Sequence, residues 1–151
     1  MEGYKTKYDV KPHVIYSLLT GNHTFRIPNF QREYVWATKE KETASDRQVN
    51  EFFNDIYEAS GQGENYYIGS IITYEGNEFE HFLVDGQQRL TTLMILFAAF
   101  RDYQLEIIGK EEYKVSDPYL RFNQQIPGNQ RQVDKLVISN RSGKEFLKEL
   151  L

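Results

Sequence analysis

Residues 82–93 read Phe82-Leu83-Val84-Asp85-Gly86-Gln87-Gln88-Arg89-Leu90-Thr91-Thr92-Leu93. The apolar run before Asp85 is typical of a strand, and the pattern from Gln87 onward is typical of the first turns of a helix. Gly86 permits a positive φ angle between the two elements and lets another group approach the backbone closely. This segment therefore predicts a strand, a one-glycine turn and a helix start.

The flanking sequence alternates between strand-like and helix-like patterns. The predicted elements, in chain order, are a helix over 11–19, a strand over 24–27, a helix over 46–60, strands over 66–74 and 79–84, a helix over 90–108, a polar connection over 110–132, a strand over 136–138 and a helix from 144. Gly21 and Gly109 follow two of these helices as stop signals, and Asn140 or Ser142 is expected to cap the last one. The predicted fold class is α+β.

Composition excludes several classes of protein. The chain has 151 residues, of which 40% are hydrophobic and 15% aromatic, which is enough to build a core. It has no cysteine, which excludes a disulfide scaffold, a thiolate metal site and a cysteine nucleophile. Its three histidines are scattered and show no zinc-ligand spacing.

Charge is distributed unevenly along the chain. The formal net charge is −4, but residues 121–151 alone carry six basic and three acidic side chains. This basic end indicates either an edge that faces a phosphate or nucleic acid, or a chance asymmetry of a solvated surface. No secretory or membrane-spanning segment is visible, so we expect a cytoplasmic protein without membrane contact.

The predicted start of the helix at residues 85–89 carries the candidate chemistry. Backbone N–H groups of a first helical turn and the helix dipole favour an anion, and Arg89 adds a planar cation suited to phosphate. Gln87 and Gln88 can position a phosphate or a water molecule. Asp85 is a candidate Mg²⁺ ligand or water-orienting base. The alternative is an ordinary strand-to-helix turn in which Asp85 caps the helix.

A second polar and aromatic segment covers residues 27–36. Pro28 ends a strand and keeps the backbone extended, so Gln31 and Arg32 are expected to project from an irregular segment. Arg32 either contacts a phosphate or base, or forms a surface ion pair. The aromatic side chains of Tyr34 and Trp36 either stack on a nucleobase or pack as a core or lid.

A third segment, at residues 66–72, contains Gly69 and Ser70 within a predicted buried strand. Small residues at such a position leave room for a close neighbour, either a packed helix or a ligand.

Taken together, these segments resemble one family. The runs Phe25-Arg26-Ile27-Pro28-Asn29-Phe30-Gln31-Arg32, Tyr67-Ile68-Gly69-Ser70-Ile71 and Val84-Asp85-Gly86-Gln87-Gln88-Arg89-Leu90 are similar in order and spacing to the GmrSD-type N-terminal domain. That family is named for type IV restriction endonucleases, which attack modified phage DNA. The resemblance implies a ParB/sulfiredoxin-like fold, with a small mixed sheet, flanking helices and then the start of a helical region.

The resemblance also implies nucleotide chemistry. The family's nucleoside triphosphate (NTP) site falls here on Asp85, Gly86, Gln87, Gln88 and Arg89, with Gln31 and Arg32 lining the same pocket. We therefore expect an NTP-binding and NTP-hydrolysing module with Mg²⁺ at Asp85. The expected catalytic residues are Asp85, Gln87, Gln88 and Arg89. The base of the nucleotide stays open.

Two alternatives to an NTP hydrolase remain open at this point. One is a non-catalytic interaction module that nucleotide switches, and the other is a ParB-like domain that binds or nicks DNA.

The same resemblance suggests how the chain is organised. We expect a nucleotide-binding domain over residues 1–115, and a connection with the first part of a truncated helical region over 116–151. Because no histidine-based nuclease motif is present, no nuclease activity is expected from this chain. DNA is then expected to be a partner of a longer protein or of a separate nuclease, and homo-oligomers stay open.

Overall fold

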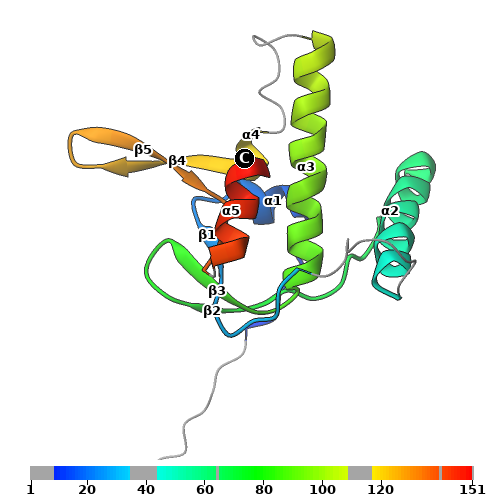
Figure 1. Ribbon diagram of the computed structural model, residues 1–151, viewed down its shortest axis with the longest axis horizontal. Helices are drawn as coiled ribbons and strands as arrows, with labels where there is room; N and C mark the ends of the chain where they lie inside the picture. The colour runs from blue at the N-terminus through cyan, green and yellow to red at the C-terminus, as the bar shows by residue number, and fades with distance from the viewer. Residues whose placement is uncertain (1–8, 35–43, 64, 109–116, 140, 151) are drawn as a thin grey trace, which may run out of the picture.

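The computed structural model describes residues 9–34, 44–63, 65–108, 117–139 and 141–150 (Figure 1). Its elements in chain order are α1 (Ile15–Thr20), β1 (Thr24–Ile27), α2 (Ala44–Gln62), β2 (Ile72–Glu75), β3 (Glu80–Asp85), α3 (Gln87–Ile108), α4 (Asp117–Leu120), β4 (Arg121–Ile126), β5 (Asn129–Asp134), β6 (Leu136–Ile138) and α5 (Arg141–Leu150). This mixture of helices with a mixed sheet confirms the predicted α+β class.

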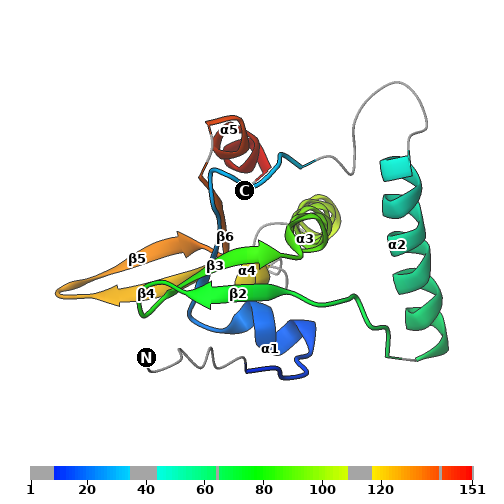
Figure 2. The ribbon, with the colours of Figure 1, turned by 90° about the horizontal axis from the view of Figure 1, so that it is seen from below.

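Four strands form the main sheet in the order β2-β3-β1-β6. The central strand β1 runs parallel to both β3 and β6, whereas β2 and β3 are an antiparallel hairpin. Parallel neighbours need long crossovers, and α2 accordingly lies in the connection from β1 to β3, while α3 and α4 lie between β3 and β6. The strands β4 and β5 form a separate two-stranded sheet that extends away from the rest of the molecule (Figures 1 and 2).

One hydrophobic cluster joins the sheet to α3. Its buried members come from both ends of the chain and are Leu19, Phe25, Ile27, Leu83, Leu90, Met94, Ala98, Leu120, Leu136, Ile138 and Leu147. The three from α3 are spaced by four residues, so they lie on one face of that helix. This packing fixes the first turn of α3 against the carboxyl end of β3. In the described part of the chain, no helix combines the length and apolarity that crossing a membrane requires.

Two predicted elements in the first half of the chain are shorter than expected. Helix α1 begins at Ile15, because Val14 still has the extended angles of an N-cap residue, and Pro12 lies outside the helix. The predicted strand over 66–74 is wrong for its first part, since β2 begins only at Ile72. Gly69 has a φ angle of +100°, which breaks the extended backbone before β2.

The prediction of a polar connection over 110–132 is wrong for its described part. Residues 117–120 form α4, and residues 121–134 form the β4–β5 hairpin, with Pro127 and Gly128 at its turn. Gly128 has a φ angle of +76°, as tight hairpin turns require. The strands lack the apolar alternation that identifies a half-buried strand, so the sequence pattern gave no sign of them.

The last part of the chain completes the main sheet and its core. The predicted division between residues 115 and 116 lies outside the described residues, as does the predicted cap Asn140. Strand β6 confirms the predicted strand over 136–138, and helix α5 begins three residues before the predicted Lys144. Because β6 pairs with β1 and Leu147 joins the common cluster, residues 117–150 pack on the same core as the first part.

A lysine lies inside this core. The side chain of Lys135 is 0% exposed, its Nζ donates to the carbonyl oxygen of Gly21, and it lies 4.4 Å from the centre of the Phe122 ring. Lys135 forms no ion pair with a carboxylate of any described residue. Burial lowers the pKa of Lys135 to about 8, because the ammonium form loses its hydration.

Replacing Lys135 by Met is expected to change the pH dependence of stability. In the unfolded chain the amine keeps the ordinary pKa of about 10.5, so between pH 8 and 10 the unfolded state binds more protons than the native state. The wild-type free energy of unfolding should therefore rise relative to that of Lys135→Met by about 2 kcal/mol over this interval. Urea denaturation at pH 8 and at pH 10 measures the difference, and parallel changes in both proteins would contradict it.

Candidate functional site

The candidate site is built on the turn between β3 and α3. Gly86 has a φ angle of +90°, and a Cβ atom on it would lie 3.0 Å from the carbonyl oxygen of Ser70 and 3.1 Å from Cα of Ile71. Gly86 is therefore required both by its backbone angle and by close packing against residues 70–71. Its carbonyl accepts the N–H of Leu90 at 2.9 Å, which begins the helical hydrogen bonding of α3.

The paired glutamines hold a second segment against the helix start. Gln87 and Gln88 are only 8% and 7% exposed. The Nε2 of Gln87 donates to the carbonyl oxygen of Arg32 at 2.7 Å, and that of Gln88 donates to the carbonyl oxygen of Glu33 at 3.2 Å. Both amides thus satisfy backbone groups of an irregular segment that has no strand partner of its own.

Residues 31–34 are fixed by two further contacts. The Nε2 of Gln31 donates to the carbonyl oxygen of Val84 at 3.1 Å. The hydroxyl groups of Tyr34 and Thr92 lie 2.9 Å apart, and the Thr92 hydroxyl also donates to the carbonyl oxygen of Gln88. Burial raises the pKa of Tyr34, so its hydroxyl stays protonated at neutral pH. The two predicted motifs, at 27–36 and 85–89, therefore come together in space.

Arg89 is the cation of this site. Its Nη2 donates to the carbonyl oxygen of Ser70 at 2.6 Å and lies 3.4 Å from Oδ2 of Asp85. Gly69 makes room for it, since a Cβ atom there would lie 3.2 Å from the guanidinium carbon. The Nε of Arg89 is buried and has no hydrogen-bond partner among the described residues. The guanidinium is thus held by the Ser70 carbonyl and Asp85, and one of its donors has no acceptor in the described part of the chain.

Asp85 and Arg32 are the exposed charges of the site. The Asp85 side chain is 64% exposed, and its pairing with Arg89 is the long one of 3.4 Å. Among the described residues, no group of three or more His, Asp or Glu side chains that could hold a metal ion is present. Arg32 is exposed and forms no ion pair with a described residue.

Some residues of this site could not be assigned by sequence reasoning alone. The pair Gly69-Ser70 was expected to leave room for a close neighbour, and the neighbour is Arg89. The contact between Tyr34 and Thr92 had no sequence signal, because it joins side chains 58 residues apart. Trp36, the other predicted stacking residue, lies outside the described residues.

Comparison with known proteins identifies the family. A search of curated proteins found no match to this chain. A comparison with protein families matches residues 15–150 to the GmrSD restriction endonuclease, N-terminal domain. This match covers the sheet, α3 and both motifs of the candidate site. The chain therefore belongs to the GmrSD restriction endonuclease N-terminal domain family and is a module of a restriction system.

Proposed function

We propose that this domain binds a nucleoside triphosphate with Mg²⁺ at the start of α3 and hydrolyses it. The observation that carries the proposal is the placement of Arg89 and Asp85 together, beside the first turn of a long helix. A helix start favours anions, and Arg89, with one donor that has no acceptor among the described residues, adds a directed cation. The exposed Asp85 is placed to hold Mg²⁺ jointly with phosphate oxygens.

In this proposal both glutamines hold the 31–34 segment, and Gln87 has a second role toward the attacking water. Both use their Nε2 atoms to hold the 31–34 segment, which keeps Gln31 and Arg32 beside the helix start. The Oε1 of Gln87 can still accept a hydrogen bond from an attacking water. Arg32, which is exposed, and Arg89 would then stabilise charge on the transferred phosphoryl group.

Binding at this place would use an exposed surface of the described part of the chain. Cavities of about 240 and 400 Å³ lie elsewhere, at the base of the β4–β5 hairpin, and residues 85–89 line neither of them. Because the Asp85 side chain is 64% exposed and that of Arg89 27%, the triphosphate is expected to lie across the exposed side of these two residues.

A thermal-shift panel with ATP, GTP, CTP and UTP, each with and without Mg²⁺, tests the proposal. At a nucleotide concentration 100 times Kd, binding stabilises the native state by about 2.7 kcal/mol, which raises Tm by about 5–10 °C in a domain of this size. No shift with any of the four would contradict nucleotide binding. Release of inorganic phosphate then separates hydrolysis from binding alone, since binding without release favours the non-catalytic switch.

A further inference from the structure

The β4–β5 hairpin projects from the molecule and is rich in amide side chains. Residues 121–134 contain six Asn and Gln residues and two Arg, against one acidic residue. The turn of the hairpin lies away from the main sheet, whereas the base of its strands adjoins the sheet (Figures 1 and 2). An arm of this kind adds little apolar surface to the core, so stability alone does not account for it.

The strand register places four amides on one face of the hairpin. Asn123 lies opposite Gln132, and Gln125 lies opposite Gln130. Directly opposed residues of an antiparallel pair share a face, and alternate pairs share the same one. All four are exposed. We call them the amide face; the opposite face carries Phe122, Gln124 and Arg131.

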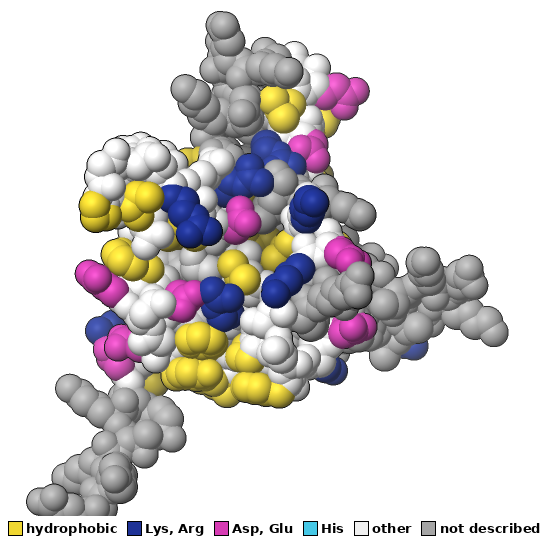
Figure 3. All heavy atoms as spheres, turned by 60° about the vertical axis from the view of Figure 1, so that its left-hand side comes forward, with side chains coloured by type: hydrophobic (Ala, Val, Ile, Leu, Met, Phe, Trp, Pro, Cys, Tyr) yellow, Lys and Arg dark blue, Asp and Glu magenta, His cyan; other side chains and the backbone are white. Residues whose placement is uncertain are grey.

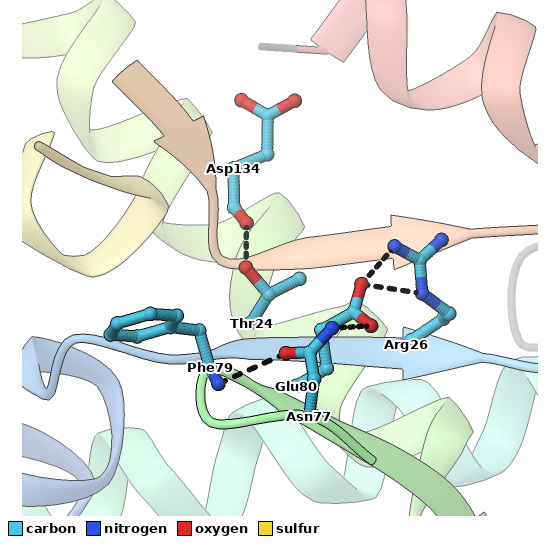
Figure 4. Close-up of polar contacts among 6 residues, drawn as sticks. All are labelled: Thr24, Arg26, Asn77, Phe79, Glu80 and Asp134. Atoms are coloured by element: carbon cyan, nitrogen blue, oxygen red, sulfur yellow. Dashed lines mark hydrogen bonds and ion pairs between the residues drawn. The ribbon is translucent and has the colours of Figure 1, made fainter. Parts of the chain in front are cut away.

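The base of the hairpin is tied to the main sheet. The hydroxyl of Thr24 donates to the carbonyl oxygen of Asp134 at 3.0 Å (Figure 4). The N–H of Phe25 donates to the carbonyl oxygen of Lys135 at 2.7 Å. Beside it, Glu80 is held by both Arg26 and Asn77. The arm is thus anchored at one end, which fixes its direction relative to the sheet.

Basic side chains adjoin the amide face. A cavity of about 240 Å³ lies between the hairpin base and α5, and its lining includes Arg121, Lys144 and Lys148. Arg121 stands on the same face as the four amides and pairs there with Asp134 at 3.1 Å, so the basic side chains without a described carboxylate partner are the two lysines. Both lysines are exposed and lie one helical turn apart. Lys and Arg side chains gather on the side of the molecule that brings the hairpin forward, with acidic side chains between them (Figure 3).

We propose that the β4–β5 hairpin enters the major groove of duplex DNA with its amide face toward the base edges, while Lys144 and Lys148 contact phosphates. The major groove, about 12 Å wide, admits a two-stranded β-ribbon, and six-residue strands span about 20 Å. Asn and Gln amides pair with adenine through two hydrogen bonds. A protein partner would favour aromatic and apolar contacts, which the amide face lacks.

This inference does not rest on nucleotide binding at the start of α3. It identifies the part of a restriction module that would contact DNA directly. Double-stranded RNA is excluded as the partner, because its major groove is too deep and narrow for side chains to read.

Selection from a pool of random-sequence 30-base-pair DNA duplexes at 50 mM salt, without nucleotide, tests the inference. The wild-type chain should enrich a preferred sequence. Asn123→Ala combined with Gln132→Ala should bind the enriched duplex at least about tenfold more weakly and lose the preference. Gln124→Ala, which removes the same amide from the opposite face, should leave affinity and preference unchanged.

A second pair of substitutions tests the phosphate contacts. Lys144→Ala with Lys148→Ala should weaken binding equally for all sequences and reduce the slope of log affinity against log salt by about 2. Equal affinity for RNA duplexes, no enriched sequence, or a loss in Gln124→Ala as large as in the double variant would each overturn the inference. Asn123, Gln132, Lys144 and Lys148 are exposed and Gln124 is half-buried, so the Tm of each variant is measured as well, and an unchanged Tm separates lost contacts from lost folding.

Discussion

Replacing Gly86 by Ala is expected to lower the free energy of unfolding by about 3 kcal/mol. A non-glycine residue at a φ angle of +90° costs about 1–2 kcal/mol, and forcing extra atoms into a packed site costs about 1–3 kcal/mol more. The second cost applies because the nearest atoms, the carbonyl oxygen of Ser70 and Cα of Ile71, belong to the backbone and cannot rotate away. Urea denaturation at pH 7 measures the loss.

Gly63→Ala is the matched control for this prediction. Gly63 also has a positive φ angle, +68°, but a Cβ atom there would meet nothing within 4 Å. This variant should therefore lose only the conformational part, about 1 kcal/mol. Equal losses in the two variants would mean that residues 70–71 do not pack on the helix start as the structure describes. Gly86→Ala should also move the carbonyl of Ser70 away from Arg89.

The helix start was predictable because its signals are local. A strand-like run, one glycine and an apolar helical repeat lie within residues 82–93, and the structure places β3, the turn and α3 there. Strands 24–27 and 136–138 were predicted for the same reason, since each is short, apolar and bounded by turn residues. In all three cases the residues that decide the structure are neighbours in the sequence.

Where prediction failed, distant residues decide the structure. Residues 66–71 have the composition of a strand. The positive φ angle of Gly69 nevertheless bends the backbone there, and the Arg89 guanidinium lies beside this bend. The β4–β5 hairpin has strands of Asn, Gln and Arg, which intrinsic preference disfavours, and its pairing depends on the Pro127-Gly128 turn and on anchoring through Thr24.

The same limit applies to the candidate site. Sequence reasoning assembled Asp85, Gly86, Gln87, Gln88 and Arg89, because they are consecutive. It did not indicate that Gln87 and Gln88 would bind carbonyl groups 55 residues away. These bonds account for the adjacent glutamines that a simple helix cap does not need, because each amide satisfies one carbonyl of a segment without regular structure.

Replacing Arg89 by Ala is expected to weaken nucleotide binding by about 100-fold. A hydrogen bond to a charged group contributes about 1.5–3 kcal/mol, and Arg89 lies in the first turn of α3 and pairs with Asp85. The stability cost should be smaller, about 1 kcal/mol, since the lost contacts are one backbone bond to Ser70 and a long, partly exposed ion pair. Calorimetric titration with Mg²⁺ and the nucleotide that gives the largest thermal shift measures the affinity.

Arg89→Lys and Arg131→Ala complete this experiment. Lysine keeps the charge but lacks the planar fork that reaches Ser70 and a phosphate together, so its affinity should lie between those of wild type and Arg89→Ala. Arg131 is an exposed arginine on the β4–β5 hairpin, and its removal changes the net charge equally without touching the helix start. If Arg131→Ala weakens binding as much as Arg89→Ala, the effect is one of overall charge. The phosphate site would then have to be sought away from residues 85–89.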